Sequence, residues 1–174
     1  MSLTDVFIYG TLISHFVLVV LIFAMIFYRP WGREVVQFIG KRGVLFSFLA
    51  ALGAIVGSLI YSNVIGFAPC ELCWWQRIFL YPQAVIFVVA LYKKDGSVFK
   101  YTVPLSILAA LVSVYHMYIQ LGGTSSVLPC AAAGGACAKV YVLAFGYITI
   151  PTMALTVALY LIVFAWMHNL AKKL

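Results

Sequence analysis

Long apolar blocks separated by short polar connections dominate the sequence. The blocks are residues 6–28, 44–67, 74–92, 101–121 and 143–167. The length of each block is close to the about 20 residues that an α-helix needs to cross the hydrocarbon core of a bilayer. Backbone amides that face lipid need partners within their own segment, and no block shows the alternation of a barrel strand. The pattern predicts an all-α integral membrane helical bundle.

Composition supports this prediction. The 174 residues are 66% hydrophobic and 9% charged, whereas roughly a quarter of the residues of a soluble domain are charged. The first block could be a signal peptide, but no Lys or Arg precedes it and the first cation, Arg29, follows it. We therefore expect a retained helix.

The connections predict two parts. Residues 1–43 form an additional N-terminal transmembrane helix and a basic cytoplasmic loop, and residues 44–174 form a four-helix core. In the first core helix, Gly53 and Gly57 have the small-xxx-small spacing that lets membrane helices approach closely. We interpret them as helix-packing residues.

The basic residues predict the orientation, because Lys and Arg accumulate in cytoplasmic loops. Two of them, Arg77 and Lys139, fall in the alternate connections, and the other nine can all lie on one side: Arg29, Arg33, Lys41, Arg42, Lys93, Lys94, Lys100, Lys172 and Lys173. The N-terminus and all cysteines are then extracytoplasmic, and the C-terminus is cytoplasmic. The net charge of +7 suits anionic membrane lipid, and no nucleic-acid binding is expected.

The four cysteines form two pairs in the outer connections. Cys70 and Cys73 make a Cys-x-x-Cys motif, which is typical of a metal half-site or a redox pair. Cys130 and Cys137 lie in an Ala/Gly-rich loop unlike a zinc knuckle, and Trp74 stands where a c-type haem site requires His. We expect no metal. Extracytoplasmic cysteines can keep disulfides, so a purely structural Cys130–Cys137 bond also stays open.

A basic residue and a histidine accompany the first pair. Arg77 follows Cys73 by one helical turn on the same face, where it and the helix N-terminus favour the thiolate. An arginine inside an apolar segment indicates function by default, and an anion or a quinone carbonyl is a natural partner, although a lipid-headgroup contact is the alternative. His116 has a similar depth and can share that ligand or serve packing. With four acidic residues in the chain, carboxylate catalysis is not expected.

The segment from Gly66 to Arg77, Gly-Phe-Ala-Pro-Cys-Glu-Leu-Cys-Trp-Trp-Gln-Arg, followed by Tyr81-Pro82, resembles the signature of the disulfide bond formation protein B (DsbB) family. A second cysteine pair in the next outer loop, and His116 with Gln120, extend the resemblance over about residues 44–167. The first helix is not part of it. The short spacing of the second pair resembles the BdbC-type branch.

The resemblance implies a quinone-dependent thiol oxidase of the bacterial plasma membrane. Cys70–Cys73 would be the disulfide next to a ubiquinone or menaquinone, with Cys73, Arg77 and His116 at the quinone. Cys130–Cys137 would exchange with an extracytoplasmic thioredoxin-fold partner, DsbA-like or BdbD-like, with Cys130 forming the mixed disulfide and Cys137 passing the bond to Cys70.

Two alternatives remain at this stage. A vitamin K epoxide reductase-like quinone enzyme also has four helices, but in that family the loop cysteines precede the membrane Cys-x-x-Cys. A non-enzymatic membrane scaffold with structural disulfides explains the helices, but not Arg77. Sequence alone also leaves the direction of electron flow open.

Overall fold

The protein folds into a bundle of helices. The structure is a computed structural model that describes residues 2–26, 30–123, 130 and 135–173. The helices are α1 (Leu3–Ile26), α2 (Pro30–Lys41), α3 (Gly43–Leu59), α4 (Glu71–Lys93), α5 (Phe99–Gln120) and α6 (Ile150–Ala171). A π-helical turn, Ile60–Val64, extends α3, and short 3-10 turns, Gly96–Val98 and Ala136–Ala138, lie in connections. Within these described residues there is no β-strand beyond an isolated Ala144–Ile148 bridge, so the all-α prediction is confirmed.

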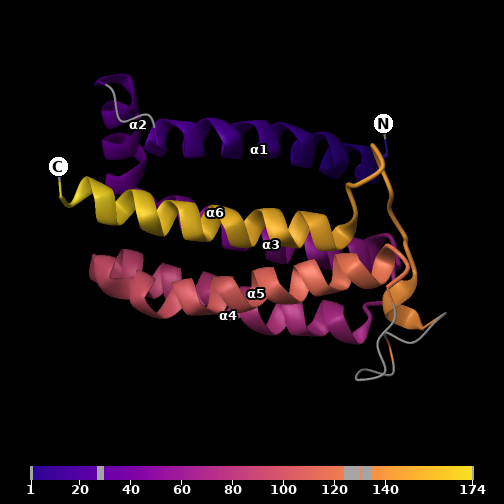
Figure 1. The fold of residues 1–174 in the computed structure, drawn as a ribbon. Helices are drawn as coiled ribbons and strands as arrows, with labels where there is room; N and C mark the ends of the chain where they lie inside the picture. The colour runs from indigo at the N-terminus through magenta and orange to yellow at the C-terminus, as the bar shows by residue number, and fades with distance from the viewer. Residues whose placement is uncertain (1, 27–29, 124–129, 131–134, 174) are drawn as a thin grey trace.

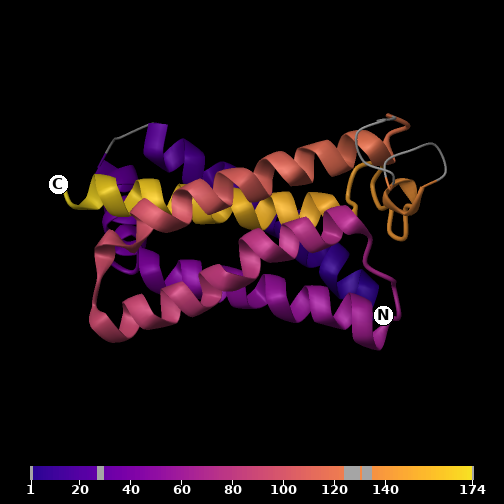
Figure 2. The same ribbon diagram turned by 90° about the horizontal axis from the view of Figure 1, so that it is seen from below.

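In the part of the chain that the structure describes, five helices are long and apolar enough to cross a membrane. They run along one common axis, and the short α2 stands across it at the end that carries the C-terminus (Figure 1). The N-terminus and the loop that follows α5 lie at the opposite end (Figures 1 and 2). Both cysteine pairs are thus at the end of the bundle that carries the N-terminus.

The last apolar block does not begin as a helix. Residues 143–149, expected at the start of the fifth span, form a turn in which Phe145 and Gly146 have positive φ angles and Ala144 pairs with Ile148. Helix α6 begins only at Ile150, with Pro151 in its first turn, a position where a missing N–H has no cost. Hydropathy alone cannot distinguish an apolar turn from the helix that follows it.

Helix α2 replaces most of the basic loop expected before residue 44. Its apolar residues Val35, Val36 and Ile39 pack with Val163 and Met167 of α6, and its charged residues, including Arg33 and Lys41, alternate with them. This amphipathic pattern supports a helix that hydropathy averaging misses. The division of the chain into parts at residues 43 and 44 remains a prediction.

The core is built from small and apolar side chains of α3 to α6, with Phe87 and Ala158 fully buried. A buried polar group also joins two helices: Gln83 of α4 accepts a hydrogen bond from Ser106 of α5 (Oγ to Oε1, 3.0 Å) and donates to the Phe79 carbonyl. Such bonds hold helices together in lipid, where apolar attraction between helices is weak. This frame fixes the N-terminal end of α4, where Cys70 and Cys73 lie, and the C-terminal end of α5, which carries His116.

Candidate redox site

The Cys-x-x-Cys motif forms the start of α4. Cys70 is the N-cap residue, and its Sγ accepts the Cys73 backbone N–H at 3.3 Å. The chain reaches this position through Gly66, whose φ of +85° suits glycine. The two sulfur atoms lie 2.7 Å apart and both cysteines are free, whereas a disulfide measures about 2.05 Å. The Cys70–Cys73 bond that the resemblance implies is therefore not formed here and stays a prediction for the oxidised protein.

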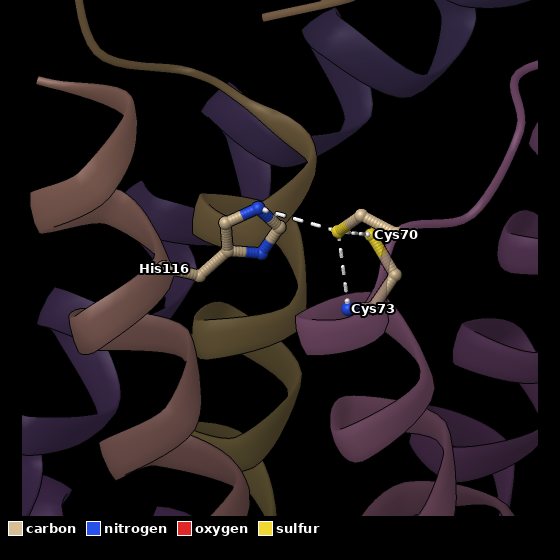
Figure 3. A group of neighbouring side chains, drawn as sticks. All are labelled: Cys70, Cys73 and His116. Carbon is tan, nitrogen blue, oxygen red and sulfur yellow. Dashed lines mark hydrogen bonds between the residues drawn. The ribbon is translucent and has the colours of Figure 1, made fainter. Parts of the chain in front are cut away.

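His116 reaches this pair from α5 (Figure 3). Its Nε2 lies 3.7 Å from the Cys70 sulfur and 3.1 Å from the Cys137 carbonyl oxygen, and its Nδ1 lies 3.5 Å from Gln76 Nε2. A carbonyl only accepts, so Nε2 carries a proton, and Nδ1 is free to accept from the Gln76 amide. The imidazole, 2% exposed, therefore contacts both cysteine pairs.

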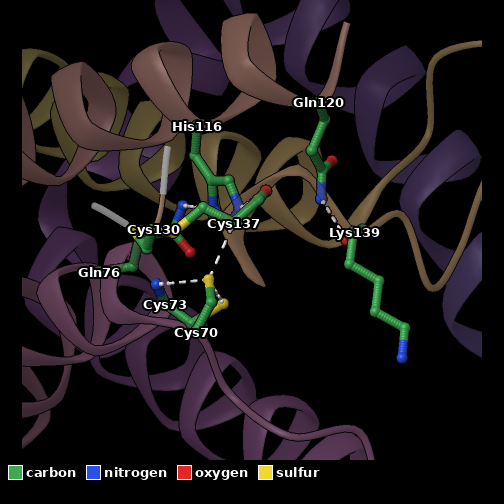
Figure 4. The surroundings of a disulfide bond; sticks show 8 residues. All are labelled: Cys70, Cys73, Gln76, His116, Gln120, Cys130, Cys137 and Lys139. Carbon is green, nitrogen blue, oxygen red and sulfur yellow. Dashed lines mark hydrogen bonds between the residues drawn. A yellow bond between two sulfur atoms is a disulfide. The ribbon is translucent and has the colours of Figure 1, made fainter. Parts of the chain in front are cut away.

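The second pair lies directly beside the first (Figure 4). Cys130 and Cys137 form a disulfide, and both pack with Cys70, Cys73 and Ile119 in one apolar cluster. Cys137 has no exposed surface, whereas Cys130 is only partly buried. All four cysteines thus meet at the N-terminal end of α4 and the C-terminal end of α5, and Cys130 is the more accessible end of its disulfide.

The thiol of Cys70 is favoured as a thiolate. The contact with the Cys73 side chain, followed by the hydrogen bond of His116, lowers the pKa of Cys70 to about 4, against the opposing effect of burial. A thiolate is the nucleophile in disulfide exchange. The environment therefore makes Cys70 reactive toward a neighbouring disulfide.

Arg77 lies on a different side of the motif, toward α3. Its Nε donates to Ser58 Oγ at 3.0 Å and its Nη2 to the Ser58 carbonyl at 3.3 Å. The guanidinium also stands over the rings of Trp74 and Tyr81, 5.1 and 5.9 Å from their centroids. These contacts hold the charge at the wall of the bundle, one turn below Cys73.

A cavity of about 530 Å³ opens at this wall. Near the cysteines it is lined by Cys73, Arg77, Ser58 and the aromatic residues Tyr61 and Phe67. Farther along α3 and α6 its lining is small and apolar: Ala50, Gly53, Ala54, Ala154 and Val157. The cavity therefore has a polar, sulfur-bearing end and an apolar extension.

The predicted site residues divide into two groups. Cys73 and Arg77 line the cavity, whereas His116, expected beside the same ligand, does not belong to its lining. His116 is turned toward Cys70 and Cys137 instead. Gln76, for which no role is predicted from the sequence, lines the cavity and also contacts His116.

Gln76 and Ser58 differ in how readily a functional role could be predicted for them from the sequence. A buried Gln76 in an apolar span is the kind of intramembrane polar residue that indicates function. Ser58 had no such signal, because serines commonly bond their own helix backbone in membranes.

The interpretation of Gly53 as a helix-packing residue was wrong. A Cβ at this position would meet no atom within 4 Å, so Gly53 borders the cavity and makes no close helix contact.

The donor set of Cys70, Cys73 and His116 could in principle hold a metal ion, since its ligand atoms lie within 4.8 Å of one another. The described geometry does not suit one. A protonated Nε2 facing the Cys137 carbonyl has no lone pair for a metal, and two thiolates on one zinc ion stand farther apart than 2.7 Å.

Comparisons with known proteins identify the family. The model of the family "Disulfide bond formation protein DsbB" matches residues 40–168. The chain belongs to the DsbB family. Disulfide bond formation protein C of Bacillus subtilis (strain 168) is 41% identical over 119 residues, covering 68% of this chain and 86% of that protein. The SPbeta prophage-derived disulfide bond formation protein B of the same organism is 42% identical, covering 64% and 74%.

A more divergent relative, a probable disulfide formation protein of Metapseudomonas resinovorans, is 34% identical in a match that covers 64% of this chain and 78% of that protein. No solved structure matches significantly. The relatives named protein C confirm the resemblance to the BdbC-type branch. This member of the DsbB family is thus a multi-pass membrane oxidoreductase with a role in disulfide bond formation.

Proposed function

We propose that the protein is a membrane thiol:quinone oxidoreductase. It reoxidises an extracytoplasmic thioredoxin-fold dithiol oxidase, DsbA-like or BdbD-like, and passes the electrons to ubiquinone or menaquinone. The observation that carries the proposal is the position of the Cys-x-x-Cys motif: Cys70 packs against the second cysteine pair while Cys73 lines the cavity. One motif thereby borders both a disulfide and a cavity.

The cavity has the chemistry that a quinone needs. Its volume, about 530 Å³, lies within the usual range for small-molecule sites. The Arg77 guanidinium and the Ser58 hydroxyl are suited to carbonyl oxygens of a ring placed beside Cys73, and the apolar extension suits an isoprenoid tail. A bound quinone supplies a two-electron acceptor.

The electron balance runs through two exchanges. The partner's two thiols become a disulfide as the Cys130–Cys137 bond is reduced, and Cys130, the more accessible sulfur, forms the mixed disulfide. Cys130 and Cys137 recover their bond as the Cys70–Cys73 disulfide is reduced, with Cys137 attacking Cys70. Reoxidation of Cys70 and Cys73 releases two electrons to the quinone and two protons.

His116 supports the exchange between the pairs in this scheme. Its contacts with Cys70 and the Cys137 carbonyl hold the two segments together. Its hydrogen bond favours the Cys70 thiolate, which leaves when Cys130 attacks Cys137 and closes the Cys130–Cys137 bond. A direct contact between His116 and the quinone stays a proposal, as does the role of Arg77 as a quinone ligand.

The decisive experiment combines the purified protein in lipid nanodiscs, a reduced DsbA-like protein and either ubiquinone-1 or menadione. We expect one partner disulfide for each quinone reduced, followed through partner thiols and quinone absorbance. Cys73→Ser abolishes quinone reduction. Cys130→Ala abolishes partner oxidation but leaves the quinone bound, which equilibrium binding measures.

Three outcomes would contradict the proposal. Full quinone reduction by Cys73→Ser would remove the motif from the electron path. An inert wild-type protein with intact disulfides would favour the scaffold. Reduction of an oxidised partner by quinol, with no reverse reaction, would assign the protein a reductive role.

A further inference from the structure

Helix α1 forms one wall of the cavity although it lies outside the family match, which begins at residue 40. Four of its residues line the cavity, Val6, Phe7, Gly10 and Thr11. Facing them are the small residues of α3 and, on the third side, Met153 and Thr156 of α6. The additional helix therefore belongs to the binding site and not only to the exterior of the bundle.

Helix α1 is held against α6 by specific contacts. His15 Nε2 lies 2.7 Å from Thr156 Oγ1, and the Tyr160 hydroxyl donates to the Ser14 carbonyl. Beyond these, Leu18 and Leu21 are buried in an apolar cluster with Val163 of α6. These contacts fix the position of α1 along α6 and do not fill the space between α1 and α3.

The contact between α1 and α3 is concentrated near the cysteine end. There Phe7 packs on Tyr61, with ring centroids 5.2 Å apart, and its ring borders Gly57. Beyond this contact both helices carry glycines that face open space: a Cβ added at Gly10 or at Gly53 would meet no atom within 4 Å. The cavity therefore continues between the two helices past the aromatic pair.

We propose that α1 and α3 together bind the isoprenoid tail of the quinone, with Gly10 and Gly53 giving the tail its passage and Phe7 separating it from the ring site. The proposal rests on the proposed function, since the redox-active sulfur of Cys73 at the other end of the cavity selects a quinone as its occupant. A tail, being apolar and flexible, suits a passage lined by glycine, alanine and aliphatic carbon.

The test fills the passage and compares quinones with and without a tail. Gly10→Trp places a large side chain in the space, and Phe16→Trp places the same side chain on α1 at a residue that is 72% exposed and outside the cavity lining. The substrates are menaquinone-4 and menadione, or ubiquinone-4 and ubiquinone-0, according to the ring that the wild type reduces.

We expect Gly10→Trp to raise the KM for the tailed quinone roughly tenfold or more and to lower equilibrium binding of the tailed quinone equally. The tailless ring compound keeps its KM within about twofold, which also shows that the variant folds. Phe16→Trp behaves as the wild type with both compounds.

Unchanged binding of the tailed quinone by Gly10→Trp would overturn the inference, and so would an equal loss for tailed and tailless compounds or the same loss in Phe16→Trp. Failure of the proposed function is a separate result, because the wild type would then reduce neither compound.

Discussion

His116 illustrates how one side chain can serve two loops. It emerges from α5, accepts at Nδ1 from Gln76 and donates from Nε2 toward the Cys137 carbonyl, with the Cys70 sulfur at the edge of that contact. Because the imidazole is buried and bonded on both sides, its orientation is constrained. We infer that it is a positioning residue that keeps Cys70 beside the second pair.

The state of Cys70 can be measured. Its pKa of about 4 lies below the about 8.5 of a free thiol, so the thiolate is present at neutral pH and is lost only as the pH falls through about 4. In reduced protein carrying Cys130→Ala and Cys137→Ala, thiolate absorbance near 240 nm should show this transition. The transition should be absent when Cys70→Ser is added to these two substitutions.

Two further variants separate the contributions of Cys73 and His116 to the lowered pKa of Cys70. Cys73→Ala should raise the Cys70 pKa most, because the Cys73 contact is the largest stabilising interaction, and His116→Ala should raise it less. A Cys70 transition near pH 8 in protein that retains Cys73 and His116 would refute the assignment.

Glycines in the helices have opposite roles, depending on what faces them. Gly40 of α2 lies against α6, where an added Cβ would stand 2.5 Å from both the Met167 carbonyl oxygen and the Ala171 Cβ. Gly53 of α3 faces the cavity. Only the first of these glycines permits a close approach of helices.

Alanine substitutions at Gly40 and Gly53 should therefore change the free energy of unfolding differently. Gly40→Ala should lower the free energy of unfolding by about 1–3 kcal/mol, since α2 must shift away from a backbone carbonyl. Gly53→Ala should be neutral or stabilising by up to about 1 kcal/mol, because alanine favours a helix. Thermal unfolding in detergent measures both, and equal destabilisation by the two changes would contradict this contrast.

Helix α1 contributes at the level of the element. Most of its large apolar side chains away from α6 are exposed, among them Phe16, Phe23 and Ile26, as expected of a lipid-facing surface. Its cavity face is formed by residues near its N-terminus. The same helix can thus face lipid along most of its length and still border the binding site.

The whole bundle predicts one arrangement in the membrane. The N-terminus, the Cys-x-x-Cys motif and the second cysteine pair lie at one end, and the C-terminus and α2 lie at the other (Figure 1). The described basic residues of the predicted cytoplasmic side belong to α2, to the connections that follow α2 and α4, to the adjoining ends of α4 and α5, and to the segment after α6. Arg29 lies outside the described residues. We propose that the C-terminal end is cytoplasmic, in the bacterial plasma membrane.

Reporter fusions test this orientation. Alkaline phosphatase, which is active outside the cytoplasm, should be active when fused within the α5–α6 loop and inactive when fused after residue 173. A fluorescent protein that folds in the cytoplasm should show the opposite pattern. Phosphatase activity at the C-terminus would reverse the orientation and place the cysteines in the cytoplasm.

Much of the architecture could be predicted from the sequence because lipid imposes a local rule. A segment of sufficient length and hydropathy must be a helix. The predicted spans agree with the observed helices to within about four residues at each end, except at residues 143–149, which precede α6. The Cys-x-x-Cys motif and Arg77 could likewise be identified, because their spacing on one helix is a local property.

Only the tertiary structure could show which side chains of different helices contact one another. Whether His116 points toward the cavity or the cysteines, whether Gly53 packs or borders open space, and whether the first helix stands apart or completes a wall depend on side chains distant in the chain. Periodicity and hydropathy specify which face of a helix is apolar, but the packing of α1 and α6 determines what that face meets. The sequence by itself determined the helices and identified the candidate redox residues. The tertiary structure placed the second cysteine pair on one side of the Cys-x-x-Cys motif and a cavity walled in part by α1 on the other.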